Sequence, residues 1–295
     1  MKYCLGTVQF GTRYGIQGNG QPQYDDVYNM LSYAVDHGIS HFDTASVYGE
    51  AERILGRFIS TNPEYADRIL IISKLDPDSF KNKKSEWDKI AVKSAKECLS
   101  LLGVLRFDTY LFHNASYVYD KEAIDALCTV RNVGLTERIG VSVYSPDEAM
   151  EALMHSQIDV IQVPYNLFDR RLDKAGFFKE AKNRGITVYA RSTLLQGLAL
   201  MDSERLPEKV SFAKDYLVEF EKICKRFSVS KLEAAIGYVN QKEGIDYILF
   251  GVDSQEQLEE YLSFDNYRLS DEMIEQIDEL FYDVPEKLVN PVLWR

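Results

Sequence analysis

The chain has 295 residues and a mass of 33.9 kDa, with 45% hydrophobic and 27% charged residues. This composition is typical of a globular protein with a large core, and it excludes intrinsically disordered, collagen-like and disulfide-scaffold classes. The 46 acidic residues outnumber the 34 Lys and Arg residues, and the resulting net charge of −12 disfavours general binding to nucleic acids or anionic membranes.

Short apolar runs alternate with amphipathic stretches along the whole chain. The runs are rich in β-branched and aromatic residues, as in strands that are covered on both faces. We expect strands at residues 3–8, 39–42, 69–73, 109–112, 139–143, 160–163, 187–190 and 247–250. We expect helices at residues 24–36, 50–60, 85–101, 121–133, 147–155, 174–184, 215–227, 231–242, 255–263 and 271–281.

This alternation predicts a (β/α)₈ TIM barrel with eight parallel strands, an additional C-terminal helix and a tail, formed by a single domain over residues 1–295. The alternative is a doubly wound open sheet. That fold usually has a phosphate-binding G-x-G-x-x-G motif after its first strand, and Gly15, Gly18 and Gly20 have the wrong spacing for it.

The cysteines and the N-terminus predict a cytoplasmic protein. The four cysteines are far apart, which indicates reduced thiols rather than disulfides or a zinc site: Cys4, Cys98, Cys128 and Cys224. The N-terminal stretch is similar to a strand rather than a signal peptide. No apolar run approaches the length of about 18 residues that a membrane span needs. No set of His, Cys and carboxylate residues has the spacing of metal ligands, so we expect no metal.

Chemically active side chains stand where three successive strands end. In a barrel the active site lies at the carboxyl ends of the strands. Asp43 follows the second strand, with Tyr48 in the loop beyond, while Lys74 ends the third strand and His113 the fourth. Each residue alone has an ordinary structural explanation. Together they would share one cavity, where Asp43 and Lys74 can neutralise each other.

This set of residues predicts proton donation to a carbonyl oxygen. A phenol with a pKa of about 10 is a weak acid at neutral pH, and a neighbouring ammonium lowers that pKa. Asp43 would hold Lys74 charged, and His113 would orient the substrate oxygen. A tuned Tyr48 implies a substrate oxygen that gains negative charge, as when hydride adds to an aldehyde or ketone, and the hydride must come from a cofactor.

Several motifs resemble those of the aldo-keto reductase superfamily. The sequence reads Leu-Gly-Thr-Val-Gln-Phe-Gly at 5–11 and Asp-Thr-Ala-x-x-Tyr-Gly at 43–49, followed by Glu52 and Leu55-Gly56. The resemblance covers nearly the whole chain. It implies a barrel that binds NADP(H) in an extended form without a Rossmann fold. It also implies a catalytic tetrad of Asp43, Tyr48, Lys74 and His113, in which Tyr48 is the general acid.

The same resemblance implies cofactor contacts after strands five to seven. Ser142 and Gln162 match residues that hold the nicotinamide carboxamide, although Val143 stands where an asparagine is usual. The loop after strand seven resembles the pyrophosphate loop, with Ser192, Leu194 and Gln196 as contacts. Arg191 takes the place of the side chain that stacks on the nicotinamide, where a guanidinium can also stack.

The segment after strand eight corresponds to the family's adenine-binding region. Its predicted contacts are Gly251, Val252, Asp253, Gln257, Glu260 and Tyr261. Residues 250–261 contain no Lys or Arg, which the family commonly uses for the 2′-phosphate. Carboxylates there would weaken NADPH binding relative to NADH, with partial compensation from helix amides and Ser254. We therefore predict NADP(H) by resemblance, with NAD(H) as the alternative.

We expect an NAD(P)H-dependent oxidoreductase that reduces an aldehyde or ketone, such as a sugar or sugar derivative, to an alcohol. Its partners would be the nicotinamide cofactor and a small carbonyl substrate. The tail over residues 283–295 would close over the substrate, as the family's C-terminal loop does. Two alternatives stay open: a nucleotide-binding regulatory subunit with little turnover, and a lyase or isomerase that forms a Schiff base on Lys74.

Overall fold

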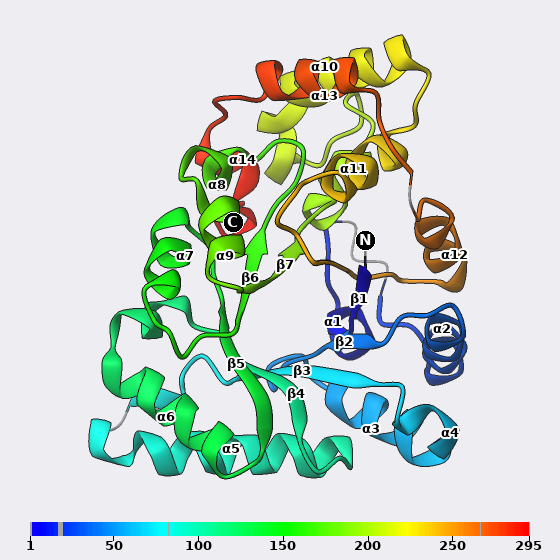
Figure 1. Cartoon of the computed structure of the whole chain (residues 1–295). Helices are drawn as coiled ribbons and strands as arrows, with labels where there is room; N and C mark the ends of the chain where they lie inside the picture. The colour runs from blue at the N-terminus through cyan, green and yellow to red at the C-terminus, as the bar shows by residue number, and fades with distance from the viewer. Residues whose placement is uncertain (1, 17–19, 82, 266, 295) are drawn as a thin grey trace.

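A closed barrel of parallel strands forms the centre of the protein (Figure 1). The computed structural model describes residues 2–16, 20–81, 83–265 and 267–294. Each strand pairs with the next along the chain, and β8 pairs with β1. The strands are β1 (Lys2–Gly6), β2 (His41–Asp43), β3 (Leu70–Leu75), β4 (Phe107–Phe112), β5 (Thr136–Ser142), β6 (Val160–Pro164), β7 (Thr187–Arg191) and β8 (Tyr247–Phe250). The predicted (β/α)₈ fold is confirmed.

Helices surround the barrel on its outer side (Figure 1). The α-helices are α1 (Val8–Gly11), α2 (Tyr24–Asp36), α3 (Ala51–Thr61), α4 (Pro63–Ala66), α5 (Trp87–Leu102), α6 (Lys121–Asn132), α7 (Pro146–Leu153), α8 (Arg171–Lys174), α9 (Phe177–Asn183), α10 (Lys214–Phe227), α11 (Lys231–Asn240), α12 (Gln255–Ser263), α13 (Asp271–Leu280) and α14 (Glu286–Val289). Short 3₁₀ turns are η1 (Ser79–Lys81), η2 (Lys84–Glu86), η3 (Ala115–Tyr119), η4 (Leu195–Leu200), η5 (Glu208–Ala213) and η6 (Pro291–Leu293).

Two predicted elements differ from the structure in an informative way. The first strand ends at Gly6 rather than at residue 8, because the short helix α1 begins at Val8. The helix expected over 174–184 begins only at Phe177, as α9, and Gly176 with a φ of +70° separates it from the short helix α8, which ends at Lys174. A residue in the left-handed region cannot continue an α-helix, so the chain turns there before α9 begins.

Helix periodicity and capping explain the outer layer. Helix α2 buries Val27, Met30, Leu31, Ala34 and Val35, and this spacing places one apolar stripe against the barrel. Several helices begin at a serine whose hydroxyl accepts a bond from the first-turn backbone, and α7 and α11 have complete capping boxes. These local signals agree with the alternation of strands and helices along the chain.

The barrel interior has its own small core, distinct from the layer between helices and strands. It consists of Cys4, Ile72, Leu111, Val160, Tyr189 and Leu249. These side chains fill the barrel, so it is a packed core rather than a channel. A ligand cavity can therefore open only beyond this core, at an end of the barrel.

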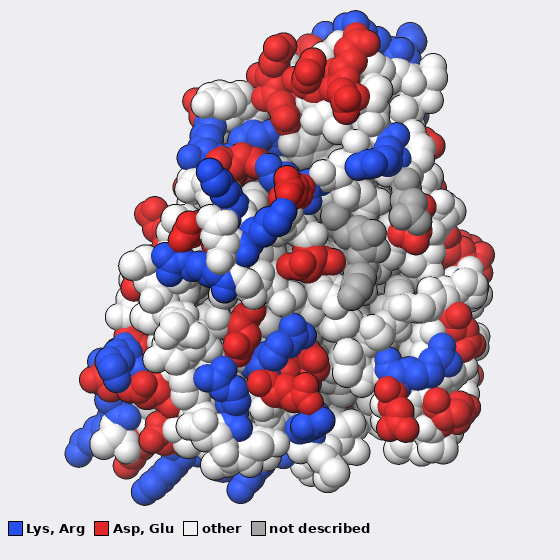
Figure 2. Space-filling model, in the orientation of Figure 1, with Lys and Arg blue, Asp and Glu red and all other residues white. Residues whose placement is uncertain are grey.

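Charged groups of both signs are mixed over most of the visible surface, whereas acidic side chains gather over α13 (Figure 2). Within the described residues, no helix is both long and apolar enough to cross a membrane. All four cysteines are free thiols, and three of them are buried.

Candidate active site

A cavity of about 720 Å³ opens at the carboxyl ends of the strands. Three predicted catalytic residues line it, Asp43, Tyr48 and His113, while Lys74 lies behind them. All the predicted cofactor contacts line the same cavity: Ser142, Gln162, Arg191, Ser192, Leu194, Gln196, Gly251, Val252, Asp253, Gln257, Glu260 and Tyr261. The structure therefore brings together residues that are more than 200 positions apart in the sequence.

A buried ion pair forms the floor of the site. Lys74 Nζ donates to both carboxylate oxygens of Asp43, at 2.6 and 2.8 Å, and to the backbone oxygen of Thr44 at 2.9 Å. Asp43 is 2% and Lys74 1% exposed. Gln162 Nε2 donates to the same carboxylate at 2.8 Å. Because the carboxylate cancels the lysine charge and every partner is hydrogen-bonded, the pair can persist without water.

Tyr48 lies next to this pair, but its pKa differs from the expected direction. Lys74 Nζ is 3.4 Å from the Tyr48 hydroxyl oxygen. The pKa of Tyr48 is nevertheless raised well above its usual value, first by burial and next by the charge of Asp43. Burial of the phenol, followed by the charge of Asp43, outweighs the lowering of the Tyr48 pKa that was expected from Lys74. The phenol thus stays protonated at neutral pH.

His113 completes the group as a neutral imidazole. Its ring packs edge-on against the Tyr48 ring, with centroids 5.8 Å apart. Burial, followed by the charges of Lys74 and Arg191, lowers the pKa of His113 to about 3. Its Nδ1 is buried without a hydrogen-bond partner among the described residues. A neutral histidine here can exchange one hydrogen bond with a ligand without adding charge.

Close backbone packing fixes the loop that carries Tyr48. A Cβ atom on Gly11 would lie 1.8 Å from the backbone oxygen of Tyr48. Gly49, with a φ of +58°, has no room for a Cβ either, because the Gly11 oxygen would be 2.3 Å away. On the outer face of β3, the buried Glu52 accepts a 2.8 Å bond from Ser73, the neighbour of Lys74. These contacts explain the two glycines and the glutamate of the motif.

The predicted carboxamide contacts lie side by side on β5 and β6. Ser142 Oγ donates to Gln162 Oε1 at 2.9 Å, and the two residues are paired in register. The fully buried Val143 supplies only backbone atoms at the position where an asparagine was expected. Its backbone oxygen accepts a 2.8 Å bond from Arg191. The Arg191 guanidinium from β7 thus lies against the backbone of Val143.

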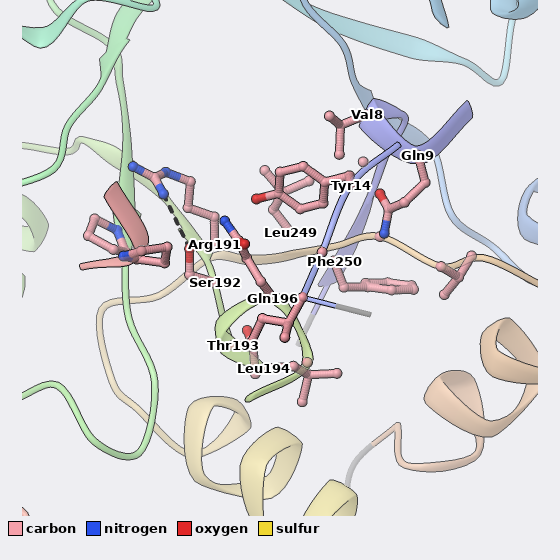
Figure 3. A pocket seen from close by; sticks show the side chains of 18 of the residues that line it. Val8, Gln9, Tyr14, Arg191, Ser192, Thr193, Leu194, Gln196, Leu249 and Phe250 are labelled. Atoms are coloured by element: carbon pink, nitrogen blue, oxygen red, sulfur yellow. Dashed lines mark hydrogen bonds between the residues drawn. The ribbon is translucent and has the colours of Figure 1, made fainter. Parts of the chain in front are cut away.

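Arg191 stands at the end of β7 and spans the cavity wall. Its guanidinium carbon lies 4.5 Å from the ring centroid of Tyr144, and it donates to Ser192 Oγ at 3.2 Å. Figure 3 shows Arg191 and Ser192 on one side of the cavity view, with Gln9 and Phe250 on the other. Arg191 Nε is buried without a partner in the described part of the chain.

The loop after β7 holds an unusual backbone conformation. Ser192, Leu195 and Gln196 have φ values of 64°, 47° and 56°. Non-glycine residues in this region cost about 1–3 kcal/mol each, so the surroundings must enforce the conformation. Part of that enforcement is the Ile16 amide, which donates to the backbone oxygen of Gln196 at 3.2 Å. Ser192 and Gln196 of this loop line the cavity.

The adenine-side segment presents acidic and capping groups. Asp253 and Glu260 both line the cavity, and Arg191 is the one Lys or Arg among the described lining residues. Ser254 caps α12 by accepting a bond from the Gln257 amide, and Gln257 Oε1 accepts from the Asp253 amide. Ser254 and the first amides of α12 were expected to bind a 2′-phosphate in place of a cation, and the helix cap already uses some of these groups.

Sequence reasoning missed two groups of lining residues. One follows β1: Val8, Gln9, Tyr14, Gly15 and Ile16. The other belongs to the tail: Val289, Asn290, Pro291 and Val292. The motif at 5–11 was a signal for Val8 and Gln9, because it continues past the end of β1 at Gly6. The tail was anticipated only as a segment, without individual contacts.

A nicotinamide dinucleotide fits the chemistry of this lining. Gln9 Oε1 is buried without a hydrogen-bond partner among the described residues, and the glutamine packs where a Cβ on Gly251 would lie. Unpartnered polar atoms in a cavity call for a polar ligand. Among the described residues, no group of three or more His, Cys, Asp or Glu could hold a metal ion.

Comparisons with known proteins agree with this geometry. A family model described as "Aldo/keto reductase family" matches residues 2–281. The chain is 26% identical to L-glyceraldehyde 3-phosphate reductase of Escherichia coli O157:H7, covering 86% of this chain and 83% of the relative. It is 24% identical to NADH-specific methylglyoxal reductase of Escherichia coli K12, covering 79% and 81%.

A solved structure supports the same fold. The crystal structure of a proposed aldo-keto reductase from Pseudomonas aeruginosa has a TM-score of 0.64 and 20% identity, covering 93% of this chain and 90% of that one. At this identity the likeness bears on the fold alone. The family model matches nearly all of the sequence and therefore shows the family to which the chain belongs. The chain belongs to the aldo/keto reductase family, a family of oxidoreductases.

Proposed function

We propose that this protein reduces an aldehyde or ketone to an alcohol, with NADH or NADPH as the hydride source. The observation that carries the proposal is the cluster of Asp43, Tyr48, Lys74 and His113 in the cavity that the predicted cofactor contacts also line. A proton donor, a neutral hydrogen-bonding group and a buried ion pair converge there, and their chemistry matches carbonyl reduction.

Each residue has a distinct role in the proposed reaction. The nicotinamide cofactor, when bound, supplies hydride to the carbonyl carbon. Tyr48 holds the proton that the carbonyl oxygen takes as it gains negative charge. Lys74 is held charged by Asp43 and lies 3.4 Å from the hydroxyl oxygen of Tyr48, where it stabilises the phenolate that is left. His113 is neutral and orients the carbonyl oxygen by a hydrogen bond.

Ser142 and Gln162 would hold the carboxamide of the cofactor. Ser192, Leu194 and Gln196 would contact its phosphates from the strained loop after β7. Gly251, Val252, Asp253, Gln257, Glu260 and Tyr261 would surround its adenosine. The polar substrate class, a sugar or sugar derivative, is supported by two relatives whose names refer to L-glyceraldehyde 3-phosphate and methylglyoxal, both small polar carbonyl compounds.

We propose that NADH binds at least as well as NADPH. Carboxylates of Asp253 and Glu260 would repel a 2′-phosphate, and no lysine or arginine from residues 250–261 would offset them. One relative is named as NADH-specific. Titration with both cofactors at fixed salt tests the idea. Comparable or NADH-favouring dissociation constants would support it, and a hundredfold preference for NADPH would sink it.

Replacement of Tyr48 by Phe tests the catalytic proposal. General acid catalysis contributes roughly a factor of 10²–10⁴, so Tyr48→Phe should lower kcat by at least about a hundredfold and leave cofactor binding intact. The exposed Tyr119 provides a matched control, and Tyr119→Phe should keep full activity. Unchanged turnover in Tyr48→Phe would contradict the proposed role.

The same experiments address the alternatives. A wild-type protein that binds cofactor but reduces no carbonyl in a broad panel would favour a nucleotide-binding regulatory role. A Schiff base on Lys74 is disfavoured because its ammonium already donates to Asp43 and to the Thr44 backbone. The free cysteines fit the proposed cytoplasmic location.

A further inference from the structure

Arg191 introduces a positive charge into the cavity that no nearby acid neutralises. Among the described residues, no carboxylate lies within 4 Å of its guanidinium, which instead contacts Val143 O, Ser192 Oγ and the Tyr144 ring. Its Nε is buried without a partner. A half-buried cation with only neutral partners leaves a strong local field.

The formal charges of the tetrad residues, without that of Arg191, sum to zero. Asp43 and Lys74 form a close pair, so their combined charge is zero at this end of the cavity. His113 is neutral, because its pKa is lowered to about 3. Asp253 and Glu260 belong to the segment after β8 and to α12, on the adenosine side of the predicted cofactor site. The formal charges of the tetrad and Arg191 therefore sum to +1.

This charge lies directly beside the predicted carboxamide contacts. Arg191 donates to the backbone oxygen of Val143, whose amide donates to the backbone oxygen of Gln162 at 2.9 Å. Ser142, the neighbour of Val143, is bonded to the Gln162 side chain. Arg191 and Pro164, two residues beyond Gln162, are register partners. A nicotinamide held by Ser142 and Gln162 must lie close to the guanidinium.

We propose that Arg191 makes this site discriminate between the oxidation states of the cofactor, so that the reduced form binds more tightly than the oxidised form. This inference rests on the proposed function. The dihydropyridine ring of NADH or NADPH is uncharged, whereas loss of hydride to the carbonyl carbon leaves a pyridinium with one positive charge. A fixed guanidinium repels the pyridinium and not the dihydropyridine.

The consequence is selective loading and release. The protein would take up the reduced cofactor in the presence of the oxidised one and would release the oxidised product readily. The same repulsion opposes charge formation on the ring during hydride transfer, so the advantage lies in cofactor exchange. Arg191 also attracts the negative charge that develops on the substrate oxygen, and its field acts in the direction that lowers the pKa of Tyr48.

The test is a set of equilibrium titrations by calorimetry with NADH, NAD⁺, NADPH and NADP⁺ at fixed salt. For wild type we expect a dissociation constant at least tenfold lower for the reduced form of whichever cofactor binds. Arg191→Gln should reduce the ratio of the dissociation constant of the oxidised form to that of the reduced form by at least fivefold, mainly through tighter binding of the oxidised form. Arg191→Lys keeps the charge and should retain most of the ratio.

A control variant that removes one positive charge outside the cavity shows whether the effect depends on the position of Arg191 or only on the net charge of the protein. Lys287 is exposed on the tail, packs its ammonium 4.5 Å from the Phe212 ring centroid and does not line the cavity. Lys287→Gln should leave the ratio unchanged. Retained binding of the reduced cofactor by Arg191→Gln demonstrates that this variant is folded.

Two outcomes would overturn the inference while leaving the proposed function intact. One is an equal ratio in wild type and Arg191→Gln. The other is an equal loss of both oxidation states in Arg191→Gln, which would assign Arg191 to the cofactor phosphates instead. Failure of wild type to bind any of the four nucleotides would overturn the proposed function and this inference together.

Discussion

Asp43 and Lys74 form a buried ion pair, so we expect substitutions of these two residues to have strongly non-additive effects on the free energy of unfolding. The ammonium–carboxylate distances of 2.6 and 2.8 Å and the near-complete burial of the pair remove solvent screening. Removal of one partner from a buried pair leaves an uncompensated charge, which costs about 3–5 kcal/mol. Asp43→Asn leaves Lys74 charged without its counter-ion. Lys74→Met leaves the carboxylate with the Gln162 amide as its one side-chain donor among the described residues.

The double variant distinguishes charge pairing from simple loss of packing. In Asp43→Asn with Lys74→Met both charges are gone, so neither desolvation penalty remains. We expect the double variant to be destabilised by at least about 2 kcal/mol less than the sum of the single variants. Urea denaturation followed by circular dichroism gives the free energy of unfolding for all four proteins.

An exposed pair of similar geometry provides the control. Lys121 and Asp125 are 2.6 Å apart on α6, with side chains that are 80% and 49% exposed. Lys121→Met and Asp125→Asn should change the unfolding free energy little, because water screens this pair. Additive effects at Asp43 and Lys74, or single-variant costs as small as those of the control, would refute the electrostatic account of the site.

Three further predictions concern individual residues. The pKa of His113 is about 3 in the folded chain against 6.5 in the unfolded chain, so the stability that this residue contributes is fully present above pH 6.5 and is lost as the pH falls from 6.5 toward 3. His113→Gln should therefore remove up to about 2 kcal/mol of the stability difference between pH 6.5 and pH 4.5, measured by urea titration. Gly11→Ala should displace the Tyr48 backbone and lower both kcat and the thermal midpoint, and normal values of both would contradict the packing argument. Trp294 donates through Nε1 to the Lys287 backbone at 2.6 Å, so Trp294→Ala should loosen the tail and raise KM more than it lowers kcat, whereas an unchanged KM would separate the tail from the substrate.

The fold and the tetrad could be predicted because they depend on repeating local signals. Apolar runs alternate with amphipathic stretches, and the carboxyl end of each strand is readable from the run that precedes it. Asp43, Lys74 and His113 follow such runs directly, so closure of the barrel brings them together. The late start of α9 after Gly176 was harder to predict, because an isolated glycine in a helical pattern is often tolerated.

Cavity contacts and proton affinities depend on packing, which local patterns do not specify. Gln9 and Tyr14 line the site because of how the chain continues after β1, and no periodicity encodes that path. The raised pKa of Tyr48 follows from its burial and from the charge of Asp43, and the sequence does not show how deeply the phenol is buried. Spacing along the chain identifies the neighbours of a group, but not how completely one neighbour cancels another.

Because Asp43 and Lys74 form an ion pair, Arg191 is the residue of the site whose charge has no acidic partner among the described residues. Lys74 is held by Asp43 so closely that it acts mainly within the pair, and its replacement disturbs the fold as well as the chemistry. Arg191 has no acidic partner among the described residues, and its charge acts on Tyr48, His113 and Tyr14. A loss of activity in Lys74 variants must therefore be separated from a loss of stability. Arg191 variants avoid that ambiguity. Within the described residues the guanidinium bonds one backbone oxygen and one hydroxyl, so it can be replaced without exposing a buried counter-charge.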